Sequence, residues 1–223
     1  MVSRPADSKA ATYSRGEEIF NMVTHIVGGG LAIAATALCV VFAALRHNVW
    51  GVVGCSVFGA TMILLYTMSS VYHGLKPETS AKRVLRVLDH CTIFVLIAGT
   101  YTPFSLVTLR AYSAALGWSV FGVIWGLAVL GIVFTAVNLE RFRVFSGILY
   151  LVMGWLVLFT IRPVAQAVGL GGMLMLVGGG LCYTAGAGVY HFARGRAYAH
   201  GVFHLLVIAG SVLHSLCILF YVI

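Results

Sequence analysis

Charged side chains are scarce in this sequence. Asp, Glu, Lys and Arg make up 9% of the 223 residues, and 61% of the residues are hydrophobic. A soluble domain is typically about 25% charged and about 45–50% apolar. The composition therefore excludes an ordinary water-soluble domain and is typical of a chain that lies within a lipid bilayer.

Acidic residues are fewest of all, with six Asp and Glu against fourteen Lys and Arg, for a net charge of +8. This excess does not indicate nucleic-acid binding, because the basic residues are scattered in short loops and form no stripe on one face. We expect no nucleic-acid partner. An integral membrane protein uses such residues to fix its orientation.

Paired cysteines are also lacking. Each of the five cysteines lies inside an apolar run, and no Cys-x-x-Cys pair occurs. Isolated buried cysteines behave as small hydrophobic residues. The pattern therefore favours neither disulfides nor a thiolate metal site.

Seven long apolar runs fill most of the chain. They are 21–45, 50–72, 89–109, 114–137, 145–161, 171–192 and 200–222. Each is near the ~20 residues that a helix needs to cross ~30 Å of hydrocarbon, and none shows the alternation of a barrel strand. We predict an all-α membrane protein with one seven-helix domain over 17–223, after a cytoplasmic tail over 1–16. No signal peptide is expected, because residues 1–18 are polar and mixed in charge.

The Lys and Arg residues predict the orientation. Eleven lie on the N-terminal side of the predicted bundle and three on the opposite side. The eleven are Arg4, Lys9, Arg15, Lys76, Lys82, Arg83, Arg86, Arg141, Arg143, Arg194 and Arg196, and the three are Arg46, Arg110 and Arg162. The positive-inside rule then places the N-terminus in the cytoplasm and, after seven spans, the C-terminus outside.

Glycine is concentrated in the sixth run, 171–192. Small residues let helices approach closely in a membrane, where packing drives helix association. We predict that this run forms a central helix that packs against its neighbours.

Polar residues inside the runs gather at one depth. Glu18, Asn21 and His25 share a helical face at the start of the first run, Ser69 and His73 end the second, Asp89 opens the third, and His200 and His204 open the seventh. With the predicted topology, every one of these residues lies at the cytoplasmic end of its helix. Polar side chains within a membrane are costly and usually functional.

His200 and His204 predict a metal site. Residues four apart lie on one helical face, about 6 Å apart, so two imidazoles can reach one ion. With His73 they would leave a fourth position open for water, as in catalytic zinc sites. Iron, copper and nickel also suit imidazole, so zinc is a preference. We predict one Zn²⁺ per chain and Asp89 as the general base. Ser69 would form a hydrogen bond to the water or to a substrate carbonyl. Glu18, Asn21 and His25 would orient these groups.

Simpler interpretations remain for several of these residues. Asp89 could pair with Arg86 alone, Ser69 could bond its own helix carbonyl, and Glu18 could only complement the helix dipole. Four further histidines are interpreted as interfacial or structural; they are His47, His90, His191 and His214. For His214, which lies about 15 Å deeper than His204, a helix–helix hydrogen bond is expected.

The motifs in this order resemble the hemolysin III family, the bacterial branch of the progestin and adiponectin receptor superfamily. They are Glu18-x-x-Asn21-x-x-x-His25, Ser69-x-x-x-His73, Asp89-His90 followed by AGTYTP at 98–103, Gly154-Trp155, and His200-x-x-x-His204 followed by Gly210-Ser211. The resemblance implies seven helices with an intracellular N-terminus and zinc on His73, His200 and His204. It also implies that Asp89 touches the metal through water. Related alkaline ceramidases use a similar site to cleave a lipid amide.

The function expected is that of a zinc-dependent hydrolase of acyl-lipid amides or esters. It would be a multi-pass protein of the bacterial inner (plasma) membrane that takes membrane lipid at the cytoplasmic leaflet. Two alternatives remain: a membrane-fluidity sensor with structural zinc, and a cytolysin. A monomeric pore is disfavoured, because a channel needs polar groups along its full path and the outer halves of the runs carry few. The sequence predicts no particular oligomeric state.

Overall fold

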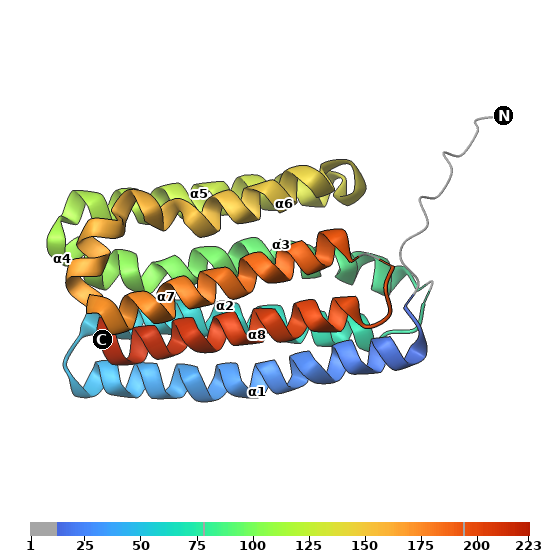
Figure 1. Ribbon diagram of the computed structural model, residues 1–223, viewed down its shortest axis with the longest axis horizontal. Helices are drawn as coiled ribbons and strands as arrows, with labels where there is room; N and C mark the ends of the chain where they lie inside the picture. The colour runs from blue at the N-terminus through green and yellow to red at the C-terminus, as the bar shows by residue number, and fades with distance from the viewer. Residues whose placement is uncertain (1–12, 78, 194) are drawn as a thin grey trace.

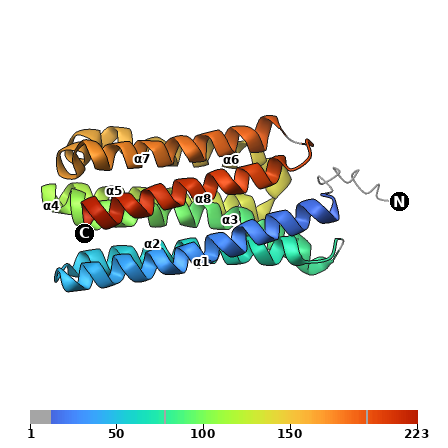
Figure 2. The ribbon, with the colours of Figure 1, turned by 60° about the horizontal axis from the view of Figure 1, so that its bottom comes forward.

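The computed structural model describes residues 13–77, 79–193 and 195–223, and these residues form helices joined by short turns. The long helices are α1 (Arg15–Leu45), α2 (Val49–Gly74), α3 (Ser80–Pro103), α5 (Ala114–Val137), α6 (Leu139–Trp155), α7 (Ile161–Phe192) and α8 (Ala199–Cys217). Shorter elements are a π-helical turn Phe104–Leu109, α4 (Arg110–Tyr112), a 3₁₀ turn Leu156–Thr160 and a π-helical turn Ile218–Val222. The helices lie roughly side by side in one bundle (Figures 1 and 2). The expected all-helical architecture is thus confirmed for the described residues.

Six helical segments of the described chain are long and apolar enough to cross a membrane. One of them, Leu139–Phe192, is 54 residues long and consists of α6, the 3₁₀ turn Leu156–Thr160 and α7. Figure 1 shows the chain reversing direction between α6 and the long part of α7, so that α6 lies beside α5 and α7 beside α8.

A short helical stretch precedes the predicted sixth run. α7 spans Ile161–Phe192, but Gly169, with a φ of 62°, breaks it into two helical parts, and the part after the break agrees with the predicted run 171–192. Pro163 is tolerated because the first turn of a helix needs no amide donor at that position. The short helical stretch before Gly169 lies between the fifth and sixth predicted runs.

The helix at the centre of the bundle is α3, so the prediction for the glycine-rich run was wrong. Ten of the 24 residues of α3 are buried, against six of the 32 residues of α7. The glycines do mark close contacts, as expected: a Cβ at Gly179 would lie 2.3 Å from the His214 ring of α8. Close approach to one neighbour does not make a helix central, and the other face of α7 stays exposed, with Leu170 and Leu174 among its exposed residues.

α1 begins earlier than its apolar run because its first turn is capped. The Ser14 hydroxyl accepts from the Glu17 amide, and the Glu17 carboxylate accepts from the Ser14 amide, which satisfies two backbone donors at the helix start. The helix therefore includes Arg15 and Gly16 of the tail expected at 1–16. Residues 1–12 of that tail lie outside the described residues.

α3 also begins before its apolar run. The Thr79 hydroxyl accepts from the Lys82 amide and caps the helix, so residues 80–88 extend it by more than two turns. Asp89 therefore lies inside α3 rather than at its start, and the side chains before it reach toward α1 and α6.

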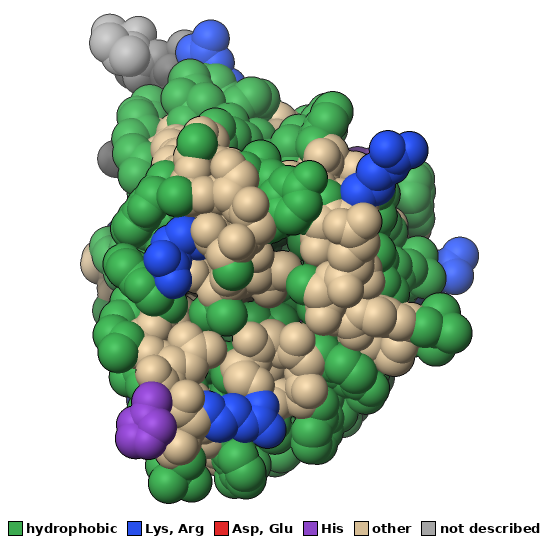
Figure 3. All heavy atoms as spheres, turned by 90° about the vertical axis from the view of Figure 1, so that its left-hand side faces the viewer, with side chains coloured by type: hydrophobic (Ala, Val, Ile, Leu, Met, Phe, Trp, Pro, Cys, Tyr) green, Lys and Arg blue, Asp and Glu red, His purple; other side chains and the backbone are tan. Residues whose placement is uncertain are grey.

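The two ends of the bundle differ. α1 and α8 begin, and α2 ends, at the end of the bundle opposite the C-terminus (Figure 1). The face at the C-terminal end shows Lys and Arg side chains and no Asp or Glu (Figure 3). The polar residues singled out by the sequence lie at the other end.

Candidate metal centre

Three histidines from two helices converge at that end. His73 is the penultimate residue of α2, and His200 and His204 lie in the first two turns of α8. The Nε2 atom of His200 lies 3.2 Å from Nε2 of His73 and 3.1 Å from Nε2 of His204. Nitrogen atoms of all three lie within 4.8 Å of one another. The cluster could hold a metal ion.

The nitrogen spacing matches what a shared ion requires. Zn–N bonds of about 2.0–2.1 Å at a tetrahedral angle place two nitrogens about 3.3 Å apart. The two Nε2···Nε2 distances, 3.2 and 3.1 Å, are close to that value. The side chains would therefore need to move only slightly to bind an ion.

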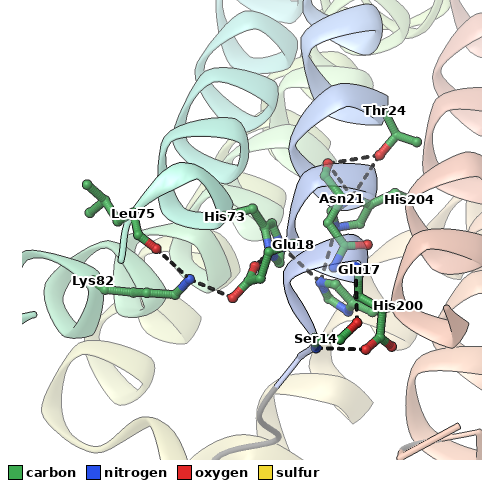
Figure 4. A network of polar contacts seen from close by, with 10 residues as sticks. All are labelled: Ser14, Glu17, Glu18, Asn21, Thr24, His73, Leu75, Lys82, His200 and His204. Carbon is green, nitrogen blue, oxygen red and sulfur yellow. Dashed lines mark hydrogen bonds and ion pairs between the residues drawn. The ribbon is translucent and has the colours of Figure 1, made fainter. Parts of the chain in front are cut away.

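The partners of the outer ring nitrogens set the tautomers of His204 and His73. His204 Nδ1 lies 3.2 Å from the backbone carbonyl oxygen of Asn21 and 3.2 Å from the Thr24 hydroxyl. His73 Nδ1 lies 2.6 Å from Oε2 of Glu18 (Figure 4). A carbonyl or carboxylate oxygen can only accept, so each Nδ1 carries the hydrogen and each Nε2 presents a lone pair. This is how metal-ligating histidines are usually held.

The donor set fits a cation better than it fits hydrogen bonds within the cluster. His200 Nε2 faces the lone pairs of both His73 and His204, and without an ion a single N–H would be shared between two acceptors. Its Nδ1 is buried without a partner in the described chain. Further buried polar atoms near the cluster lack partners among the described residues; they belong to Asn21, His25 and Ser69. Native proteins leave few such atoms unpaired, so this end of the bundle is built for an additional polar ligand.

Asp89 and Ser69 lie against the histidine cluster. Ser69 is one turn before His73 on α2 and is buried. The carboxyl of Asp89, from α3, interacts with both Ser69 and His73. The approach to the Ser69 hydroxyl lacks the geometry of a full hydrogen bond, because Ser69 Oγ has no such partner. The Asp89 carboxyl and the Ser69 hydroxyl therefore lie near each other and near His73.

Asn21 and His25 reach the cluster from one face of α1. The His25 ring stacks on His204 with centroids 3.6 Å apart and planes 11° from parallel. Asn21 approaches α8 at Gly201, where a Cβ would lie 2.4 Å from Phe20 and 3.1 Å from Oδ1 of Asn21. Glycine at 201 therefore permits the close contact that lets the Asn21 carbonyl hold His204.

The structure brings together residues from α1, α2, α3 and α8, as the sequence predicted. Three further contacts had no clear signal in the sequence: Thr24 beside His204, Lys82 on Glu18, and Tyr13, which stacks on His200 with centroids 5.1 Å apart. Tyr13 precedes the first apolar run, where no periodic pattern singles it out. Burial raises the pKa of its hydroxyl. His214 is not part of the cluster; its Nε2 lies 3.0 Å from the Leu176 carbonyl on α7, which confirms the expected helix–helix hydrogen bond.

Comparison with known proteins agrees with these motifs. The family model described as Haemolysin-III related matches residues 13–215. Hemolysin-3 of Bacillus cereus is 37% identical over 206 residues, 92% of this chain and 92% of that protein. The Hemolysin-3 homolog of Bacillus subtilis (strain 168) is 37% identical over 205 residues, covering 92% and 94%. The human Monocyte to macrophage differentiation factor is 25% identical over 206 residues, 89% of this chain and 81% of that protein.

The match runs from the residues before α1 to residue 215 in α8 and includes every residue of the histidine cluster and its surroundings. Two bacterial relatives exceed 30% identity over nearly their whole length. The chain is a multi-pass membrane protein and belongs to the haemolysin-III related family.

Proposed function

We propose that this protein is a zinc-dependent hydrolase of acyl-lipid amides or esters that acts at the cytoplasmic leaflet of the bacterial inner membrane. One Zn²⁺ per chain is held by His73, His200 and His204. A membrane lipid is the substrate.

The proposal includes seven spans with a cytoplasmic N-terminus. Because α6 and α7 run in opposite directions on either side of the 3₁₀ turn, the 54-residue segment counts as two crossings. An odd number of crossings agrees with α1 beginning and the chain ending at opposite ends of the bundle (Figure 1). The eleven-to-three distribution of Lys and Arg favours the cytoplasm for the end with the histidines.

The observation that carries the enzymatic proposal is the cluster of three imidazoles with the Asp89 carboxyl near it. A structural zinc site is usually closed by four protein ligands, whereas a catalytic site keeps an open position. The described cluster offers three imidazoles, and the Asp89 carboxyl lies next to His73 and Ser69. Asp89 is not in the group of ligand atoms that lie within 4.8 Å of one another, which favours a base that acts on a water molecule over a fourth ligand.

The residues then have separate roles. When bound, zinc supplies Lewis-acid activation of water for attack on a carbonyl carbon. Asp89 accepts the proton of the attacking water and returns it to the leaving amine or alcohol. The Ser69 hydroxyl donates a hydrogen bond to the substrate carbonyl oxygen. Glu18 and the Asn21 carbonyl hold the His73 and His204 rings in the ligating orientation.

The experiment is hydrolysis by the purified protein. Full-length protein in lipid–detergent micelles is assayed for zinc by elemental analysis and for fatty-acid release from labelled acyl amides and esters. Release is expected to stop when a chelator removes the zinc and to return when zinc is added. His214→Ala is the control that keeps both zinc and turnover, since His214 bonds the Leu176 carbonyl elsewhere in the bundle. A zinc-loaded protein that cleaves neither amide nor ester contradicts the enzymatic proposal.

A second candidate, cytolysis, is favoured by the name Hemolysin-3 of the Bacillus cereus relative. It is tested by dye release from liposomes that contain the purified protein. Release that is unaffected by chelation and by His200→Ala would favour this candidate over the hydrolase.

A further inference from the structure

Lys82 connects three helices beside the histidine cluster. It lies in the first turn of α3, and its Nζ is 2.6 Å from Oε1 of Glu18 on α1. The same Nζ is 3.0 Å from the carbonyl oxygen of Leu75, the residue that caps α2 directly after His73 and Gly74. Figure 4 shows Lys82, Glu18 and His73 in one line of contacts.

Both carboxylate oxygens of Glu18 accept hydrogen bonds in these contacts. Oε2 accepts from His73 Nδ1 at 2.6 Å, and Oε1 accepts from Lys82 at 2.6 Å. A glutamate side chain has three rotatable bonds, so a single contact with His73 would leave its direction poorly fixed. The second contact, made from another helix, removes that freedom.

The contacts that join Lys82, Glu18 and His73 are largely shielded from water. The side chains of Lys82 and Glu18 are 12% and 15% exposed, and that of His73 is 0% exposed. Lys82 Nζ also lies 5.1 Å from the centroid of the Tyr72 ring, an arrangement that favours a cation. A shielded ion pair depends strongly on both partners, because removing one leaves an uncompensated charge.

We propose that Lys82 is a positioning residue for the metal: it fixes Glu18, and Glu18 in turn fixes the His73 ring with its Nε2 lone pair toward His200. Lys82 touches neither the metal nor the substrate. This inference rests on the proposed metal site and adds to it a residue from α3 that sets metal affinity.

The test compares zinc affinity between variants of the full-length protein. Zinc dissociation constants are measured by competition with a chelator, and Co²⁺ absorption reports the geometry of the ligands. Lys82→Met keeps the length of the side chain and removes the charge. Loss of the groups that orient metal ligands typically weakens metal binding about 10–100-fold, and we expect a loss in this range with an altered Co²⁺ spectrum. Lys82→Arg should recover most of the affinity, because it restores a cation that can donate to Glu18.

Lys76→Met is the matched control. Lys76 is exposed in the turn between α2 and α3, so the same substitution removes one positive charge from the same end of the protein without touching Glu18. Its zinc affinity should equal that of the wild type. Thermal unfolding of each variant checks that the bundle is intact, and Lys82→Gln replaces Lys82→Met if the latter does not fold.

A double-mutant cycle with Glu18→Gln separates positioning from a general structural effect. If Lys82 acts through Glu18, Lys82→Met should change the affinity of the Glu18→Gln protein by no more than about twofold, the usual error of additivity. If Lys82 acts through the Leu75 carbonyl instead, the full loss persists in that background and the inference is wrong. Wild-type affinity in Lys82→Met also refutes it while leaving the metal site intact. A wild-type protein that binds no metal refutes the proposed function, and this inference with it.

Discussion

Replacing Asp89 by asparagine separates a catalytic metal from a structural one. Asp89 lies against Ser69 and His73, whereas the nearby Glu18 carboxylate is already engaged by His73 and Lys82. Asparagine keeps the shape and one hydrogen-bonding oxygen but cannot take a proton. The substitution therefore removes the proposed base together with its negative charge near His73.

The size of the effect follows from the role assigned to Asp89. General-base help is worth about 10²–10⁴-fold, which at about 1.36 kcal/mol per factor of ten raises the barrier by about 2.7–5.4 kcal/mol. Zinc binding should suffer less, because the three imidazoles come from α2 and α8 and the Nδ1 partners of His73 and His204 come from α1. Any loss of affinity should stay within about 10–100-fold and is overcome by excess zinc.

The assay measures zinc content and kcat for lipid-amide hydrolysis on the same zinc-saturated preparation. We expect kcat to fall by at least about 100-fold with one zinc still bound per chain. Wild-type kcat in a zinc-loaded Asp89→Asn protein would refute the base mechanism. If the metal has only a structural role, Asp89→Asn should leave the function of the protein unchanged in any assay that the wild type passes.

Three further predictions address the metal, the topology and the packing. His200→Ala should abolish stoichiometric zinc in elemental analysis, since it removes one of the three converging imidazoles, whereas His214→Ala should not; zinc at the wild-type level in the first variant would exclude the site. Arg83→Cys should react with a membrane-impermeant thiol reagent only after cells are opened, and labelling from outside intact cells would overturn the orientation. Gly179→Val should lower the midpoint of thermal unfolding, because the Cβ at position 179 would lie 2.3 Å from the His214 ring and overpacking costs about 1–3 kcal/mol. An unchanged midpoint would show that α7 and α8 can move apart at no cost in stability.

The convergence of His73, His200 and His204 could be predicted from the sequence because membrane proteins restrict where polar groups occur. His200 and His204 share a helical face by spacing alone, and the ends of the apolar runs set the depth of His73 and Asp89. What spacing cannot give is which nitrogen faces the cluster, since that depends on the Asn21 carbonyl and the Glu18 carboxylate on another helix.

Other features depend on tertiary contacts that leave no periodic signal. Lys82 looks like one more basic residue of a cytoplasmic loop, and only the helix start at Ser80 brings it over Glu18. The glycines of α7 predicted close packing correctly, but they do not say how many neighbours a helix has, so α3 was missed as the central helix. The extension of α3 before its apolar run likewise depends on a cap at Thr79 and not on hydropathy.

The different chemistry of the two ends of the bundle follows from the cost of polar groups in a membrane. Intramembrane polar residues are retained where they pair or act, and here the described carboxylates gather at the end that carries the histidines, as Glu17, Glu18, Asp89 and Glu140. The opposite face shows basic side chains and no acidic ones (Figure 3). A protein that hydrolyses lipid by this arrangement has ligands, base and ligand-orienting groups at one leaflet only. If the proposed hydrolysis takes place there, lipids confined to the other leaflet must cross the bilayer before they reach the site.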